Sequence, residues 1–210
     1  MRVTKLLAGT LALVWQSAVA FPPDVKPFEA FQPGKSIVQA NSEVNTDYRL
    51  FRRAVKAESQ KLALKNLSES DSRNEVRIWV GFGLITPRCF ILKREGGSDS
   101  ATYYSTEPDP AATARARKTS LVTLTLKSPK SGWNDFEAFL KAKGVDSTIK
   151  LVADVGYSAD PDSEAIVIEV KSHAGYNMVF FPADAKSPDG RKAIEVCHKI
   201  ESEFNVRMGC

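Results

Sequence analysis

The chain has 210 residues, of which 29 are basic and 25 acidic, and its formal net charge is +4 at pH 7. This length is enough for one domain with a substantial apolar core, and a total of only three cysteines excludes a small disulfide-dense fold. The near balance of charges argues against a nucleic-acid partner, because a protein that follows phosphates carries a clear basic surplus.

The first twenty residues have the order of a secretory signal peptide. Arg2 and Lys5 precede an apolar run over residues 6–15, and the segment ends on the cleavage sequence Ala-Val-Ala. A buried N-terminal helix would not need this order, and the run is shorter than the roughly 20 residues that span a bilayer. We therefore expect cleavage after Ala20 and a secreted or periplasmic protein that does not span the membrane. Cleavage removes two of the 29 basic residues and no acid, which leaves 27 against 25 and a net charge of +2.

Residues 21–45 are expected to form an extended arm, because their prolines interrupt both helices and central strands. Three phenylalanines lie among these prolines: Phe21, Phe28 and Phe31. Two alternatives follow, one in which the aromatic rings dock on the body of the protein and one in which the arm is a mobile tail. Residues 46–210 are expected to form a single domain.

Residues 46–66 have the pattern of an amphipathic helix. One side of the helical wheel carries apolar side chains, namely Phe51, Ala54, Val55 and Leu62. The opposite side carries a basic stripe, namely Arg49, Arg52, Arg53 and Lys56. This stripe is either a solvated outer face or a docking face for an acidic partner or a membrane surface. Asn66 then begins the sequence Asn-Leu-Ser, which accepts a glycan if the source is eukaryotic.

From Glu75 onward the apolar pattern has a period of two, which predicts β-strands. The first three strands are expected at 75–84, 89–94 and 101–105, as an antiparallel meander. Further strands are expected at 121–127, 149–155, 165–171 and 176–181. A short helix is expected from Trp133, and a final helix after Ser187 and Pro188, a capping residue followed by proline. The predicted class is α+β, with a mainly antiparallel sheet of about six or seven strands and helices packed on one face.

The strand at 75–84 offers the most unusual surface. One of its faces carries Arg77, Trp79, Gly81 and Gly83. Glycine weakens a strand, so it marks either a bulge or the close approach of another group. In one interpretation this face is packed inside the protein, against a helix or against the phenylalanine-rich arm. In the other, the face is a groove for a peptide or small-molecule ligand, and Tyr103 is a further ligand contact.

A catalytic hypothesis rests on Glu169 and Lys171, at the end of an apolar strand, and on Asp154, fifteen positions before Glu169. This pattern resembles the active site of PD-(D/E)xK nucleases. In that family two carboxylates hold Mg²⁺ and a lysine stands beside the attacking water. A period of two places Glu169 and Lys171 on one face, as that chemistry requires. No proline precedes Asp154, however, and a surface ion pair explains Glu169 and Lys171 equally well.

The three cysteines are Cys89, Cys197 and Cys210. In an oxidising compartment a disulfide can persist, and an odd number of cysteines leaves one thiol over or links two chains. Cys197 lies on the apolar face of the final helix and could pair with either of the other two. No sequence typical of serine hydrolases or zinc enzymes is present, so we expect neither a metal nor a cofactor.

The sequence therefore favours an exported, non-enzymatic binding or interaction protein, whose ligand is an unidentified protein, peptide or small molecule. One alternative is a Mg²⁺-dependent hydrolase that uses Asp154, Glu169 and Lys171. Another is a structural envelope protein with a basic docking helix at residues 49–56.

Overall fold

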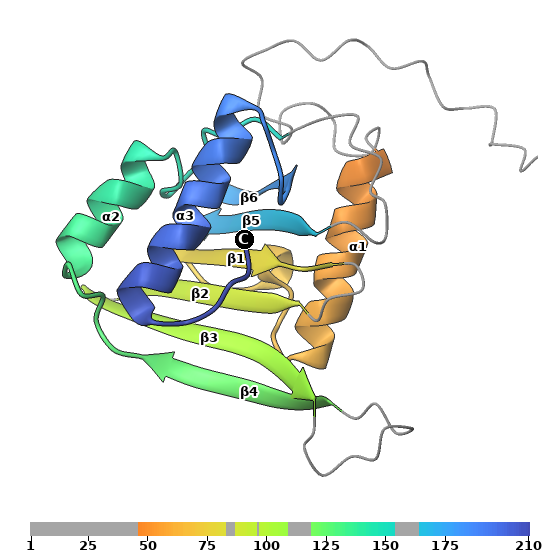
Figure 1. The fold of residues 1–210 in the computed structure, drawn as a ribbon, viewed down its shortest axis with the longest axis horizontal. Coiled ribbons are helices and arrows are strands. Elements are labelled where there is room, and N and C mark those ends of the chain that lie inside the picture. The colour runs from red at the N-terminus through yellow and green to blue at the C-terminus, as the bar shows by residue number, and fades with distance from the viewer. Residues whose placement is uncertain (1–45, 83–86, 96, 109–118, 154–163) are drawn as a thin grey trace, which may run out of the picture.

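The computed structural model describes residues 46–82, 87–95, 97–108, 119–153 and 164–210 (Figure 1). The signal peptide and arm predicted for residues 1–45 lie outside these ranges, as do Gly83 and Asp154. In chain order the elements are α1 (Thr46–Lys61), the 3₁₀ turn η1 (Leu67–Glu69), β1 (Glu75–Val80), β2 (Arg88–Glu95), β3 (Ser98–Pro108), β4 (Thr119–Leu126), α2 (Trp133–Ala142), β5 (Ala165–Ser172), β6 (Gly175–Pro182) and α3 (Pro188–Phe204).

All six strands belong to one antiparallel sheet in the order β4-β3-β2-β1-β5-β6. The meander of β1 to β4 builds one half of the sheet, and the β5–β6 hairpin joins at the free side of β1. The predicted α+β class and the predicted mainly antiparallel sheet are confirmed. Within the described residues β4 and β6 form the two edges, and Leu121 and Leu124 of β4 are each 45% exposed.

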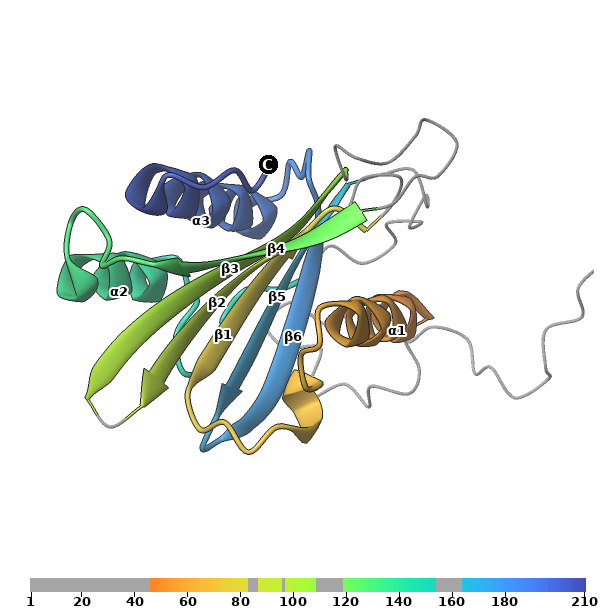
Figure 2. The same cartoon turned by 90° about the horizontal axis from the view of Figure 1, so that it is seen from below.

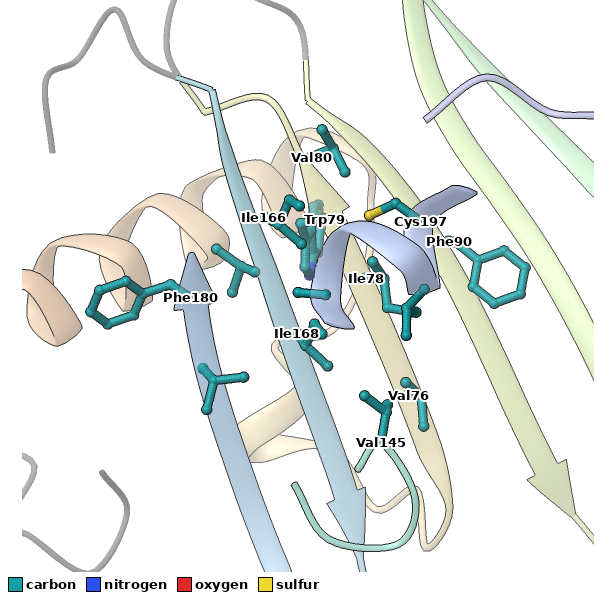
Figure 3. Packing of buried hydrophobic residues seen from close by; sticks show 14 of the residues in the cluster. Val76, Ile78, Trp79, Val80, Phe90, Val145, Ile166, Ile168, Phe180 and Cys197 are labelled. Carbon is teal, nitrogen blue, oxygen red and sulfur yellow. The ribbon is translucent and has the colours of Figure 1, made fainter. Parts of the chain in front are cut away.

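Helices α2 and α3 pack on one face of the sheet, as expected for helices gathered on one side (Figure 2). Phe90 of β2 contacts Phe136 of α2 and Phe204 of α3, with ring centroids 6.2 and 5.1 Å apart. Figure 3 shows Cys197 of α3 over the side chains that β1 and β5 direct to this face, such as Ile78 and Ile166. These contacts build the larger part of the core.

Helix α1 lies against the opposite face (Figure 2), where the ring of Phe51 stacks on Phe180 of β6 at 4.6 Å. All six residues of β1 are buried, and so are the first six of β5. A strand that is covered on both faces has no solvent side, so its sequence reads as a nearly continuous apolar run. The segment Ala-Ile-Val-Ile-Glu-Val of β5 has this character, with Glu169 as its one charged residue.

One predicted strand is wrong. Residues 149–153 have no strand structure apart from a single bridge between Ile149 and Val145. Alternation is nevertheless present, because Ile149, Leu151 and Ala153 are all buried in the core. The backbone N–H of Val152 donates to Oδ2 of Asp189 at 3.0 Å, so this segment is fixed by the first turn of α3 and not by a neighbouring strand.

The start of α3 agrees with its predicted signal. Ser187 is the N-cap, and its hydroxyl accepts from the N–H of Gly190 at 2.9 Å, while Pro188 opens the first turn. Among the described residues, no helix combines the length and the apolar composition needed to cross a bilayer.

The docking of α1 is testable with two neighbouring residues. We expect Phe51→Ala to lower the free energy of unfolding by about 3 kcal/mol, because a buried aromatic ring is lost from the contact with the sheet. Leu50→Ala is the matched control, since Leu50 is 48% exposed, and should change stability by no more than about 0.5 kcal/mol. Urea unfolding measures both. Equal effects of the two substitutions would contradict the placement of α1.

Candidate functional site

Glu169 is the centre of a buried polar cluster on the sheet face that α1 covers. It lies in β5 directly opposite Arg77 of β1, and its side chain has no exposed surface. Nε1 of Trp79 donates to Oε2 of Glu169 at 2.6 Å, and the hydroxyl of Tyr176, in β6, donates to Oε1 at 2.8 Å. Each carboxyl oxygen thus has a fixed donor from a neighbouring strand.

The positive charges of the cluster are held by the chain around η1. Nε of Arg77 donates to Oε1 of Glu75 at 2.6 Å, and its Nη1 donates to the backbone carbonyl of Lys65 at 2.9 Å. Nζ of Lys171 donates to the carbonyl of Ser68 at 3.2 Å. Two carbonyls from one short segment therefore bind the two cations, which attaches η1 to the sheet.

Burial dominates the electrostatics of this cluster. It raises the pKa of Glu169, although the nearby Arg77 and the hydrogen bonds from Tyr176 and Trp79 act in the opposite direction. Burial together with the adjacent Glu169 also raises the pKa of the Tyr176 hydroxyl. The protonated hydroxyl is therefore strongly favoured, and Tyr176 acts as a stable donor to the carboxyl group.

The structure agrees with one part of the catalytic hypothesis, the shared face of Glu169 and Lys171, and disagrees with another, an open metal site. Glu169 and Lys171 share a face, as the period of two predicts. Both oxygens of Glu169 are already bonded, however, and the ammonium of Lys171 points to Ser68, so this pair does not frame an open metal site. The surface ion pair is also wrong, because Glu169 is fully buried. In the described parts of the chain, no three metal-ligating side chains come together.

The residues predicted to line a ligand groove do not share an open surface. Trp79 is fully buried and Arg77 is 3% exposed. Tyr103 pairs with Phe90 and therefore lies on the opposite face, where its hydroxyl donates to the carbonyl of Arg207 at 2.6 Å. Gly81 is buried at the end of β1 with a φ of +84°. The described members of the predicted groove are therefore buried or lie on the opposite face, and they do not line an open surface together.

The cover comes from α1, which was the alternative explanation for this face. The ring of Phe51 meets that of Phe82 edge-on at 6.2 Å, and the Phe82 ring in turn lies 6.2 Å from the ring of Trp79. Sequence reasoning missed Tyr176 as a member of the cluster. The signal was present, because a tight β5–β6 turn at Gly175 places Tyr176 beside Lys171 and diagonally across from Glu169.

The outer face of α1 is an exposed, positively charged surface. It carries four exposed cations, namely Arg49, Arg52, Arg53 and Lys56. Within the described chain, the one ion pair found for this group joins Lys56 to Glu69 at 3.6 Å. Separately, a cavity of about 10 Å³ lies at the first residues of β1, where Glu75 and Lys171 are among its lining residues. It has room for about one water molecule.

A pH-dependence experiment tests the state of Glu169. The raised native pKa means that the folded protein holds a proton which the unfolded chain releases near its ordinary pKa of 4.5. The resulting stability is complete below about pH 4.5 and is lost as the pH rises through the native pKa. Glu169→Gln keeps the shape and does not titrate. We expect its free energy of unfolding, relative to that of the original chain, to be larger at about pH 7 than at about pH 4, because only the original chain loses stability as the pH rises.

A second variant fixes the direction of this effect. The hydrogen bond from Tyr176 lowers the pKa of Glu169, so Tyr176→Phe should move the loss of stability to higher pH. Urea unfolding over a pH series measures both variants. A difference between Glu169→Gln and the original chain that is constant with pH would show that Glu169 has the same pKa in the folded and unfolded chains, and would contradict the raised pKa.

No protein family, curated protein or solved structure was found to match this chain. The assignment of a function therefore depends on the residues and contacts described above. Among these, the buried cluster holds its polar groups away from solvent, and the basic face of α1 presents its charges to solvent.

Proposed function

We propose that the mature chain is an exported, non-enzymatic interaction module that binds an acidic protein surface through the outer face of α1. The observation that carries this proposal is the row of four exposed cations on one helix face. Export is supported by the order of charged, apolar and small residues in the first twenty positions. The alternative of an envelope protein with a basic docking helix would use the same face.

The cations of α1 form a continuous row. Arg49, Arg53 and Lys56 follow one another at helical-neighbour spacing, and Arg52 flanks them on the same side. The eight residues from Arg49 to Lys56 are joined by seven helical steps and span about 10 Å along the axis, which matches a short acidic segment on a partner. Leu50, which is 48% exposed, lies beside this row and offers an apolar contact.

The composition of the row favours a protein over a membrane surface. Three of its four cations are arginines, whose planar guanidinium groups bind carboxylates through two parallel hydrogen bonds. A helix that lies on a membrane needs a wide apolar face to insert. The apolar face of α1, with Tyr48, Phe51 and Val55, is buried against the sheet and cannot serve this purpose.

The non-enzymatic part of the proposal is supported by the state of the polar residues. Glu169, Arg77 and Trp79 are buried and bonded to one another or to the chain around η1. A catalytic group must instead reach a substrate. Glu169 and Lys171 share a face, but their polar atoms are bonded within the protein, so they do not frame the open metal site that the hydrolase alternative requires.

Charge reversal on α1 tests the docking face. We expect the double variant Arg49→Glu/Arg53→Glu to weaken binding of a fluorescein-labelled oligo-glutamate peptide at least about tenfold at low ionic strength, a change of about 1.4 kcal/mol. Lys127→Glu/Lys141→Glu is the matched control, because it changes the net charge equally at exposed positions elsewhere. Fluorescence anisotropy measures both. Equal weakening of peptide binding by the two double variants would show that the peptide responds to net charge alone, and would contradict a docking face on α1.

A photo-crosslinking side chain placed at Leu50 tests the natural partner. In the host, we expect it to capture a protein through an acidic segment that mass spectrometry can map. The same group at Leu124, which is similarly exposed at the β4 edge, is the control. Capture of lipid alone at Leu50, with anionic phosphatidylglycerol vesicles binding the protein in place of the peptide, would favour a membrane surface and contradict the proposal.

Export has its own test. Mass spectrometry of the protein recovered from outside the cytoplasm should show Phe21 as the first residue. A chain that keeps Met1 and remains in the cytosol would contradict export, whatever the result of the binding experiments.

A further inference from the structure

The segment that follows α3 folds back over the face of the sheet that α2 and α3 cover. Asn205 ends the helix in the left-handed conformation, with a φ of +54°. The carbonyl of Arg207 then accepts from the hydroxyl of Tyr103 at 2.6 Å, and that of Met208 accepts from Nη1 of Arg88 at 2.8 Å. The side chain of Met208 is fully buried in the core. The path of residues 206–210 is therefore fixed by two strands of the sheet.

The same segment is also fixed to α3. Oε1 of Glu201 accepts from the N–H groups of Met208 and Gly209, at 2.7 and 2.8 Å. Nε2 of His198 lies 3.2 Å from the carbonyl oxygen of Cys210. A side chain at Gly209 would collide with Arg88, because a Cβ atom there would lie 2.2 Å from Nη1. The φ of Gly209 is also +82°, a conformation that favours glycine where the chain approaches the helix.

This path brings two of the three cysteines together. Cys197, on the inner face of α3, is fully buried, and the neighbouring thiol of Cys210 adds to the effect of burial in raising the pKa of Cys197. Cys210 is partly buried against the core, and all three cysteines are free thiols. The Cys197 and Cys210 sulfur atoms are neighbours that lie beyond bonding distance, so formation of a bond requires a local movement that brings them together.

Cys89 is separated from this pair by the sheet itself. It pairs in register with Trp79, so its thiol lies on the face that α1 covers, whereas Cys197 lies on the face that α3 covers. Burial also raises the pKa of Cys89 well above its ordinary value, which makes it a poor nucleophile. The pairing of Cys197 with Cys89, left open by the sequence, is excluded by this geometry.

We propose that Cys197 and Cys210 are a disulfide-forming pair, and that the bond is a covalent modification that locks residues 206–210 onto α3. The formation of the bond in the living cell rests on the export part of the proposed function, because a disulfide persists in an oxidising compartment. The pairing itself rests on the path of residues 205–210 alone.

The oxidant is a disulfide, supplied by an exported thiol–disulfide oxidoreductase or by glutathione disulfide. Cys210, the more accessible thiol, loses its proton and attacks one sulfur of the oxidant; the S–S bond of the oxidant breaks, and one thiol leaves. Cys197 then loses its proton and attacks the Cys210 sulfur of the mixed disulfide, which releases the second thiol. Two electrons and two protons pass from the protein to the oxidant. Burial raises the pKa of Cys197, so the second step should be the slower one and should accelerate with pH.

The experiment uses the purified protein in a glutathione redox buffer, followed by alkylation and peptide mapping. We expect one bond, between Cys197 and Cys210, and a Cys89 that is alkylated only after unfolding. The bond closes a loop of the 14 residues from 197 to 210, so its reduction should lower Tm by about 6–12 °C. Cleavage by trypsin after Arg207 should be at least about tenfold slower in the oxidised protein.

Two variants separate the bond from ordinary packing. Cys210→Ser should fold, should have a Tm that does not respond to reductant and should lose the protection from trypsin. Cys89→Ala should keep the bond and the response to reductant. The proposal is overturned if both Cys197 and Cys210 remain alkylatable in an oxidising buffer, or if Cys89 is found in the bond. A protein that forms the bond in vitro but is recovered reduced from the cytosol would contradict export while leaving the pairing intact.

Discussion

The burial of β1 and β5 on both faces constrains the rest of this structure. These two strands carry Glu75, Arg77 and Glu169 into a layer where their side chains are almost completely buried. Buried charged groups must be paired or neutralised, because an isolated charge is costly in such a layer. The indole of Trp79, the hydroxyl of Tyr176 and two backbone carbonyls near η1 meet this requirement. The position of η1, and with it the approach of α1 to the sheet, is a result of that requirement.

Most of the fold could be predicted from local patterns, because each strand has at least one apolar side with a period of two. These patterns could not predict whether helices cover one face of the sheet or both. Trp79 stands between polar and glycine neighbours, as on an exposed face, yet α1 covers it. Alternation misled at residues 149–153 for a related reason. Alternate burial of Ile149 and Leu151 requires an extended chain beside a core, and this condition is met without a strand partner.

The sequence predicted which residues of the candidate site share a face, but it did not predict that this face is buried. Spacing alone placed Glu169 and Lys171 on one face, and the β5–β6 register confirmed it. Whether that face is open to a substrate depends on α1, which is distant in sequence and whose docking is a tertiary contact. The cysteines show the same limit. The apolar pattern of α3 predicted that Cys197 is buried. That Cys210 lies beside it depends on the turn at Asn205 and on the hydrogen bonds of Met208, which are tertiary contacts.

The edge strand β4 has a consequence for how the protein behaves in solution. Its eight residues, Thr-Ser-Leu-Val-Thr-Leu-Thr-Leu, include no charge and no proline, and within the described chain they pair on one side alone, with β3. Natural sheets usually protect such an edge with lysine, proline or a bulge, because its open amide and carbonyl groups can recruit a further strand. With Leu121 and Leu124 exposed beside them, crowding should promote self-association along β4. This strand, together with the net charge of the chain, should therefore influence the colloidal stability of the concentrated protein.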